Sequence, residues 1–359
     1  MIHRNSLLIG LILGSIVAAI IYFFFLERPA DAAESSRSPV LESAQSGPPT
    51  LSFPVDCVID QDCWYMAFVD LDARSTYRDH MCGVRTYDAH KGTDIAPNLA
   101  LVKTLDIVAA ASGRVIGIRD GLDDTPMQTE DPARDAARCG NGVRLDHGGG
   151  WTTQYCHMEN GSVAVSRGDT VEPGDKLGRI GSSGWSELPH LHFQLEKDGV
   201  PVDPYLGASP SENPEYVASR GQGLGLWRDV ASHNGDSYQP VHIRSVGLTI
   251  APPTSEQAKF GGYPKIESPD AGALVAYLVL FGAPSGARID TRIEAPAGQT
   301  LFTDSKVLER SFAEYFTFAG RKRGQQNWQA GLYTARVTIS GNGPTGAYEI
   351  SSEADLIIR

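Results

Sequence analysis

The sequence has no excess of basic residues, and this limits the partners that it can bind. It contains 31 Lys and Arg against 43 Asp and Glu, which gives a formal net charge of −12 at pH 7. Because nucleic-acid phosphates are bound by clusters of Lys and Arg, this balance argues against DNA or RNA as a partner. The 38 Gly and 22 Pro argue against a helical bundle and indicate many turns between short strands. With 359 residues, 41% of them hydrophobic, the chain is long enough for more than one packed domain.

Cysteine pairs of the CxxC type are also absent, although the chain has 5 cysteines. A tetrahedral cysteine zinc site is therefore not expected, and disulfides formed in an oxidising compartment explain the cysteines better. Cys139 and Cys156 flank a predicted hairpin with three consecutive glycines at its turn, which can bring the two sulfurs within bridging distance. Cys57, Cys63 and Cys82 then compete for one further disulfide, and one thiol of the set is left over.

The sequence has one long apolar run, from Leu7 to Leu26, which follows His3 and Arg4. A helix of this length spans a hydrocarbon core of about 30 Å, whereas the apolar region of a signal peptide has roughly 7–15 residues. We expect a transmembrane anchor over residues 1–27 that places the rest of the chain outside the cytoplasm. Cleavage is the alternative, because Ala30-Asp31-Ala32 resembles a signal-peptidase site. Residues 28–50 follow as a linker without hydrophobic periodicity.

Residues 51–207 are typical of short strands separated by glycine turns, and form the first predicted domain. The expected strands are Gly113–Ile118, Asn141–His147, Trp151–His157, Ser162–Val165, Lys176–Ile180 and His190–Leu195. The segment Arg119–Arg138 interrupts them, and a loop of this length is either disordered or a functional rim. The Gly-, Ser- and Pro-rich residues 208–229 are predicted to be a second linker.

Residues 230–359 alternate apolar and polar side chains and form the second predicted domain. We expect strands at Val241–Arg244, Ala273–Leu280, Arg288–Ala295, Gly331–Ser340 and Tyr348–Ile358. Regular short strands favour a β-sandwich of the immunoglobulin or fibronectin kind, although the Cys–Trp–Cys spacing of a true immunoglobulin domain is missing. His233 and His242 lack the spacing of metal ligands, so we expect a packing or recognition module without chemistry.

Two short motifs place histidines at spacings that suit a metal site. In His90-Lys91-Gly92-Thr93-Asp94, an imidazole and a carboxylate can reach one metal if the backbone bends at the glycine. The second motif, His190-Leu191-His192, lies in a predicted strand that presents both histidines and Gln194 on one face. The other face is apolar and would be buried, with Leu191, Phe193 and Leu195. Taken singly, each motif also fits ordinary polar residues on a strand or turn.

His157 joins these two motifs into a recognisable order. It ends a predicted strand in Tyr155-Cys156-His157-Met158 and lies between the HxGxD and HxH motifs in the chain. Together the three pieces resemble the lysostaphin-type (LytM-like) zinc endopeptidases. The sequence between His157 and the HxH motif is similar to that family as well, in Arg167–Val171, Pro173–Gly178 and Gly181–Gly184. The resemblance covers about residues 80–207.

The resemblance implies a mainly β fold and a zinc site. The first domain would be an antiparallel β-sheet whose groove holds one Zn²⁺ per chain, with His90, Asp94 and His192 as ligands. Three such ligands leave the fourth position open for water, which the metal would activate as the nucleophile. His157 and His190 would be the catalytic residues that act on the water and on the developing oxyanion, in an order that the sequence does not assign.

The resemblance also implies a substrate class, the peptide part of peptidoglycan, in its stem peptides or cross-bridges. With the expected anchor, the protein would be held in the inner membrane and face the periplasm or cell wall, or be secreted if the first segment is cleaved. The segment Arg119–Arg138 would then cover one wall of the groove.

Three other functions compete with this interpretation. A non-catalytic wall-binding or regulatory protein can use the same fold, although here all five site positions hold the expected residue types. A biotinyl or lipoyl carrier domain has similar hairpin halves, but Lys176 lacks the flanking Met that such a carrier needs. A zinc centre that cuts a Gly-rich protein instead of wall peptide would carry the same motifs.

Overall fold

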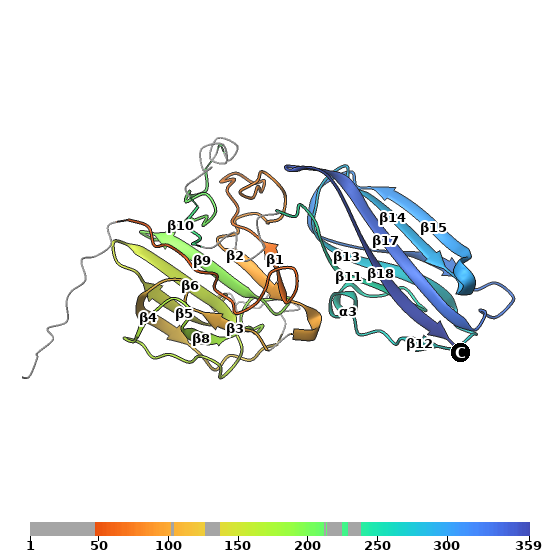
Figure 1. Cartoon of the computed structure of the whole chain (residues 1–359), viewed down its shortest axis with the longest axis horizontal. Coiled ribbons are helices and arrows are strands. Elements are labelled where there is room, and N and C mark those ends of the chain that lie inside the picture. Colours follow the sequence, from red (N-terminus) through yellow and green to blue (C-terminus); the bar gives the residue numbers. More distant parts are fainter. Residues whose placement is uncertain (1–46, 102–103, 126–136, 212, 214–224, 229–237) are drawn as a thin grey trace, which may run out of the picture. The chain divides into compact units, whose positions relative to one another are not determined.

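The computed structural model describes residues 47–359 except 102–103, 126–136, 212, 214–224 and 229–237. Within these ranges the chain is mainly β, as the sequence predicts (Figure 1). The described helical elements are α3 (Ser255–Phe260) and two 3₁₀ turns, η1 (Leu99–Leu101) and η3 (Pro296–Gly298). Across the described part of the chain, no helix has the length and apolar character needed to span a membrane. The predicted anchor over 1–27 and most of the linker over 28–50 lie outside the described residues.

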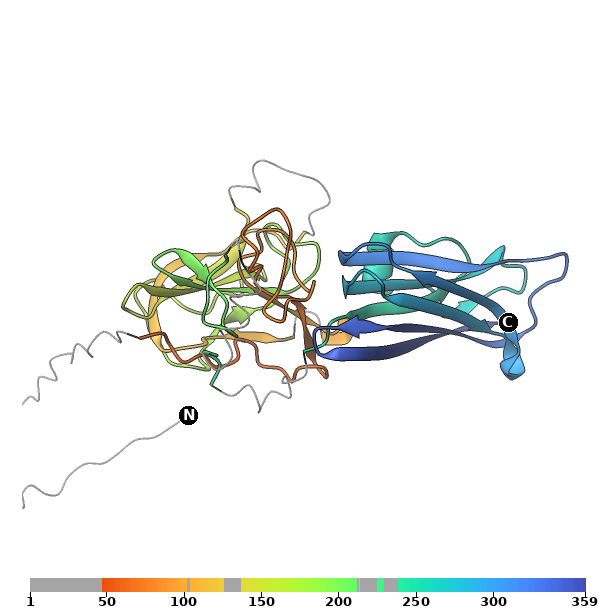
Figure 2. The same cartoon turned by 90° about the horizontal axis from the view of Figure 1, so that it is seen from above.

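An antiparallel sheet of eight strands forms the centre of the first part, in the order β1-β2-β9-β6-β5-β4-β7 with β10 paired to β9. Its strands are β1 (Cys63–Ala67), β2 (Thr93–Pro97), β4 (Gly113–Arg119), β5 (Asn141–Asp146), β6 (Trp151–Met158), β7 (Thr170–Val171), β9 (Leu191–Lys197) and β10 (Val200–Val202). A two-stranded sheet pairs β3 (Asp106–Val108) with β8 (Lys176–Arg179). Figure 2 shows the chain turned by 90° about the horizontal axis of Figure 1.

Strand β9 shows why this sequence forms a sheet with one buried face. Leu191, Phe193 and Leu195 are at most 1% exposed and lie in the main apolar cluster. Burying a side chain of this size contributes about 1.5–3 kcal/mol, so this face fixes the register of the strand. The alternate residues His192 and Gln194 are consequently held on the opposite face, as the period of two predicts.

One predicted strand, residues 162–165, is wrong. This stretch lies next to β8 without forming a strand. The carboxylate of Asp120 accepts the backbone N–H groups of Gly161 and Val163 at 2.8 and 3.3 Å. Within the stretch, the N–H of Ala164 donates to the Leu177 carbonyl oxygen of β8 at 2.9 Å, whereas the N–H of Val163 is taken by the Asp120 side chain, and no regular ladder forms. Asp120 belongs to the segment 119–138, of which residues 126–136 lie outside the described structure.

Two disulfides are present among the described residues. Cys139–Cys156 joins the ends of the β5–β6 hairpin, as predicted. The second disulfide is Cys57–Cys63, which settles the choice that the sequence left open. Cys82 takes part in neither disulfide, so one cysteine of the set is left over.

The described residues from 241 onward form two further sheets. One holds β11 (His242–Thr249), β13 (Ala273–Ala283) and β16 (Phe312–Lys322) in the order β11-β13-β16. The other runs β12-β18-β17-β14-β15, with β12 (Ile266–Glu267), β14 (Arg288–Glu294), β15 (Thr300–Val307), β17 (Gly331–Gly343) and β18 (Gly346–Ile358). Residues of both sheets share two apolar clusters. The immunoglobulin or fibronectin class of this arrangement stays a prediction.

A separate apolar cluster combines residues from the two predicted domains. Trp64 of β1 is 1% exposed and its ring stacks on the imidazole of His242 with centroids 3.9 Å apart. The same cluster contains Leu188 and, from β13, Val279 and Phe281. These contacts bring β13 next to the loop that precedes β9.

Candidate metal centre

Adjacent strands position the two histidine motifs. Asp94 of β2 and His192 of β9 are direct partners in the antiparallel ladder. His90 lies in the turn before β2, and Gly92 lets this turn approach β9. A Cβ at Gly92 would lie 2.6 Å from the Phe193 carbonyl oxygen and 2.7 Å from the His192 ring. Only glycine fits at the centre of this HxGxD motif without displacing β9.

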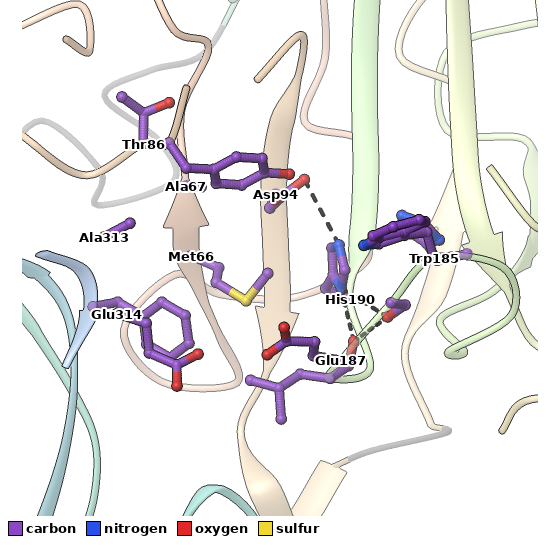
Figure 3. Close-up of a pocket in the computed structure, with 14 residues that line it drawn as sticks. Met66, Ala67, Thr86, Asp94, Trp185, Glu187, His190, Ala313 and Glu314 are labelled. Atoms are coloured by element: carbon purple, nitrogen blue, oxygen red, sulfur yellow. Dashed lines mark hydrogen bonds and ion pairs between the residues drawn. The ribbon is translucent and has the colours of Figure 1, made fainter. Parts of the chain in front are cut away.

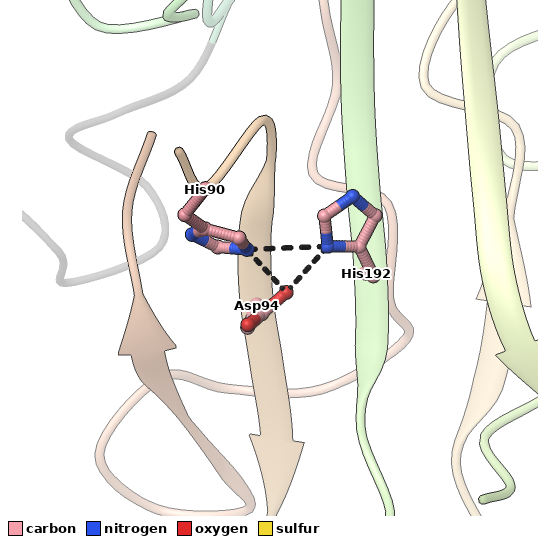
Figure 4. Close-up of side chains that lie close together, drawn as sticks. All are labelled: His90, Asp94 and His192. Atoms are coloured by element: carbon pink, nitrogen blue, oxygen red, sulfur yellow. Dashed lines mark hydrogen bonds and ion pairs between the residues drawn. The ribbon is translucent and has the colours of Figure 1, made fainter. Parts of the chain in front are cut away.

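Three atoms converge at this point (Figure 4). Oδ1 of Asp94 lies 3.1 Å from Nε2 of His90 and 2.8 Å from Nδ1 of His192. The two imidazole nitrogens are 3.2 Å apart. Ligand atoms at about 2.0–2.2 Å from a tetrahedral Zn²⁺ are separated by distances of this size.

The hydrogen bonds that the His90 and His192 rings make away from the centre determine which ring nitrogen of each is unprotonated and directs its lone pair toward the centre. Nδ1 of His90 donates to the carbonyl oxygen of Phe68 at 2.6 Å, so Nε2 is the basic nitrogen. Nε2 of His192 lies 3.3 Å from Oε1 of Gln194, whose amide nitrogen donates to Glu196 at 2.6 Å. His192 therefore presents Nδ1 as a lone pair. Two lone pairs 3.2 Å apart repel each other unless positive charge lies between them.

Asp94 adds negative charge to the same point. Its carboxylate is 1% exposed, and Oδ2 has no hydrogen-bond partner within the described structure. Burial works against ionisation, but the nearby imidazoles of His90 and His190 and the bond with His192 hold the pKa of Asp94 well below its usual value. Burial also acts to lower the pKa of His192, and its contact with Asp94 raises that pKa overall. The lowered pKa of Asp94 and the raised pKa of His192 have the same meaning: the negative carboxylate favours positive charge at the point where these groups meet.

His157 and His190 lie beside the three converging residues. Nε2 of His190 is 3.8 Å from Oδ1 of Asp94, and the ring centroids of His157 and His190 are 4.6 Å apart. Both rings use Nδ1 to donate to a backbone carbonyl oxygen, of Ser183 for His157 at 2.8 Å and of Leu188 for His190 at 2.7 Å. Each ring thus offers Nε2 as a basic nitrogen near the centre.

Burial keeps these two imidazoles neutral. Burial is the largest cause of two shifts: it lowers the pKa of His190, and it lowers the pKa of His157 well below its usual value. For His157 the repulsion of His190 and His192 acts in the same direction. The backbone of His157, one residue before the end of β6, has a positive φ of 61°, an uncommon conformation for a non-glycine residue.

Two hollows flank the centre and share His157, Tyr87 and Trp185 in their linings. The first has a volume of about 340 Å³ and contains Asp94 and His190 (Figure 3). The second, of about 320 Å³, contains His90 and His192 and is bordered by the Cys139–Cys156 disulfide. The centre therefore lies between two cavities, an arrangement that suits a chain bound on both sides of one reacting bond.

The structure brings together all five residues that the sequence predicts for the site, and it adds others. Sequence patterns did not indicate the Phe68 carbonyl oxygen that orients His90, or Glu196, which anchors Gln194 and pairs with Arg144. His190, His192, Gln194 and Glu196 are every second residue along the chain and so lie on one face of the strand. Extending the alternation beyond Gln194 by two residues would have indicated Glu196. Trp185 could have been found from one feature of the sequence, since it is an aromatic residue in the glycine-rich loop before His190.

The donor set matches a zinc ion better than an alkaline-earth ion. Two imidazole nitrogens and one carboxylate oxygen are typical of a catalytic zinc site with an open position, whereas Ca²⁺ and Mg²⁺ prefer oxygen ligands. His90, Asp94 and His192 also form a candidate metal group by their mutual distances. The residues present fit the metal that the sequence resemblance implies.

Comparison with known proteins identifies the same segment. Residues 88–204 match the model of Peptidase family M23. Among curated relatives, "Stage II sporulation protein Q" of Bacillus subtilis is 31% identical over 121 residues, 33% of this chain and 36% of that protein. "Peptidoglycan DD-endopeptidase ShyA" of Vibrio cholerae is 32% identical over 88 residues, 23% of this chain and 20% of that protein. The chain thus spans about a third or less of the length of these relatives.

Among solved structures, the catalytic domain of lysostaphin from Staphylococcus simulans is 27% identical, with 32% of this chain and 76% of that chain covered and a TM-score of 0.24. The matched residues 88–204 contain the HxGxD motif, His157 and the HxH motif. The resemblance seen in the sequence is thereby confirmed, and the chain carries a peptidase domain of family M23 over residues 88–204.

Proposed function

We propose that the protein is a zinc-dependent endopeptidase that hydrolyses peptide bonds in peptidoglycan. The observation that carries this proposal is the convergence of His90 Nε2, Asp94 Oδ1 and His192 Nδ1 within 3.2 Å of one another, with both imidazole lone pairs directed inward. The match to a peptidase family supports the hydrolase class. The complete ligand set favours catalysis over the non-catalytic alternative, which needs no such convergence.

His90, Asp94 and His192 would hold the zinc ion. When bound, the ion supplies Lewis acidity to a peptide carbonyl and to water. The chain's own residues fix this position, because the Phe68 carbonyl oxygen orients His90 and the Gln194–Glu196 pair orients His192. Such outer hydrogen bonds set the tautomer and the direction of a ligating imidazole.

His157 and His190 would move the protons of the reaction. The Ser183 and Leu188 carbonyl oxygens hold a proton on each Nδ1, so each neutral ring has Nε2 available to accept one. A ring that has taken a proton from water becomes a donor, either to the developing oxyanion or to the leaving amine. The buried setting keeps both rings neutral until that transfer.

The substrate and compartment are also part of the proposal. One relative is named a peptidoglycan endopeptidase, which supports wall peptide as the substrate class. The two disulfides suit an oxidising compartment. We infer that the protein acts outside the cytoplasm, in the periplasm or at the cell wall, and is held there by the apolar run Leu7–Leu26 or released if that run is cleaved.

The test is digestion of purified wall sacculi with residues 47–359, with and without chelator. We expect chelator-sensitive release of peptide fragments, which mass spectrometry will identify together with the bond that is cut. His192→Ala should release no fragments and retain no zinc after dialysis, while His147→Gln, outside the centre, should behave as wild type. Binding to sacculi without release of any fragment by the zinc-loaded protein would establish the non-catalytic alternative instead.

A further inference from the structure

The hollow on the His190 side of the centre has an apolar lining supplied in part by the C-terminal strands. Met66 of β1 and Leu188 contribute apolar surface from the peptidase part, and Phe281 of β13 contributes it from the C-terminal part. Glu314 of β16 lines the same space. Figure 3 shows Met66, Glu187 and Glu314 in the lining of the hollow together with Asp94 and His190.

Two carboxylates and one ammonium meet beside this hollow, so their charges do not cancel. Nζ of Lys259 in α3 lies 2.6 Å from Oε2 of Glu187 and 2.8 Å from Oε1 of Glu314. Two carboxylates share one ammonium, so the trio carries one net negative charge. The Lys259 side chain is 11% exposed, whereas those of Glu314 and Glu187 are 28% and 61% exposed and can reach a bound molecule. Among the described residues that line the hollow, none is Lys or Arg.

We propose that this hollow is a substrate subsite for a residue whose side chain is an aliphatic stem that ends in a primary amine. The stem would pack on Met66, Leu188 and Phe281, and the ammonium would bind Glu187 and Glu314. Asp94 and His190 line the same hollow, so the residue bound there is adjacent to the bond that is cut. This inference rests on the proposed peptidase function and adds a specificity to it.

The carboxylates of Glu187 and Glu314 are suited to select the amine, because without it the two share a single cationic partner, Lys259. With the amine bound, each carboxylate has a cationic partner; with a neutral side chain, one negative charge is left in a partly desolvated space. A partly exposed pair of this kind gives about a fivefold preference. If the trio served only to tie α3 to the loop before β9, its charge would affect stability but not the choice of peptide.

The experiment compares two synthetic stem peptides that differ in one group. One contains a lysine with a free side-chain amine, and the other has that amine acetylated. Binding is measured by calorimetry and cleavage by kcat/KM, for wild type, Glu187→Gln/Glu314→Gln and the control Glu353→Gln. Glu353 is an exposed carboxylate on β18 that pairs with Arg336. The glutamines keep an oxygen that accepts from Lys259, so the variant changes the trio from one negative to one positive charge.

We expect wild type and Glu353→Gln to bind and cleave the amine peptide about fivefold better, and the double variant to lose or reverse this preference. Cleavage of both peptides at equal rates by wild type would overturn the subsite and leave the proposed function intact. A preference in binding without any cleavage by the zinc-loaded protein would support the subsite and overturn the peptidase function. Neither binding nor cleavage of either peptide would overturn both.

Discussion

His157 is the one residue of the five at the site that has a positive backbone φ. Its positive φ of 61° and its Nδ1 bond to the Ser183 carbonyl oxygen leave Nε2 free to act beside His90, Asp94 and His192, the proposed zinc ligands. We predict that His157→Ala keeps one bound zinc and lowers kcat by about 10²–10⁴-fold, the usual contribution of a positioned acid or base. Zinc content by atomic spectroscopy and peptide turnover measure the two effects separately.

His192→Ala is the matched comparison for this prediction. Because Nδ1 of His192 lies 2.8 Å from Asp94 Oδ1, its removal should abolish zinc retention and turnover together. Equal zinc content in wild type and His192→Ala would refute the ligand assignment. Loss of zinc in His157→Ala would place that ring among the ligands instead.

His80 makes the fold sensitive to acid. Its ring stacks on Tyr205 with centroids 4.2 Å apart, and burial lowers its pKa to about 4. An unfolded histidine has a pKa of about 6.5, so between pH 6.5 and 4 the unfolded chain takes up a proton that the folded chain does not. The free energy of unfolding therefore falls as the pH drops through this window, by up to about 3 kcal/mol.

His80→Phe should remove most of this acid sensitivity, because phenylalanine fills a similar space and cannot be protonated. Urea unfolding at pH 7 and pH 4 gives the free energy at each pH. The variant should lose less stability between the two values than wild type does. An identical loss in both proteins would show that other groups cause the acid dependence.

At the scale of elements, the Cys139–Cys156 disulfide closes the β5–β6 hairpin and lines the same hollow as His90 and His192, two of the proposed zinc ligands. It links cysteines 17 positions apart, against 6 positions for Cys57–Cys63. Because the longer loop has more entropy when unfolded, Cys139→Ala/Cys156→Ala should cost about 3 kcal/mol and the Cys57→Ala/Cys63→Ala control about 2 kcal/mol. Chemical denaturation measures both. A larger loss in the control would mean that loop entropy does not govern these disulfides.

Strand β9 shows how much of the site the sequence could predict. The alternation from His190 to Leu195 gave both its buried face and the face that carries His192, because side-chain direction in a strand depends only on local spacing. The stretch 162–165 was expected to be a strand too, yet it forms none, and a side chain distant in sequence, that of Asp120, accepts the backbone N–H of Val163 within it. Local pattern identifies a strand where no such competitor exists.

Contacts between distant parts of the chain were beyond the sequence patterns. Glu187 and Glu314 meet at Lys259, and Met66 and Phe281 line one hollow, although each pair comes from different predicted domains. No spacing rule links such residues, because their proximity follows from the packing of β13 and β16 near the loop before β9. The C-terminal domain was expected to be a packing or recognition module without chemistry, and the structure places three residues of its strands, Phe281, Ala313 and Glu314, in the lining of this hollow.

At the scale of the whole molecule, the net charge of −12 opposes approach to an anionic wall polymer. Repulsion between exposed charges is screened beyond about 30 Å at 0.01 M salt and about 8 Å at 0.15 M salt. We therefore predict that digestion of intact sacculi becomes severalfold faster as NaCl rises from 0.01 to 0.15 M. Turnover of the acetylated stem peptide should change little over the same range. Turbidity of a sacculus suspension and chromatography of the peptide follow the two reactions in parallel. If salt slowed sacculus digestion, the wall would be held by an attractive patch that outweighs the net charge.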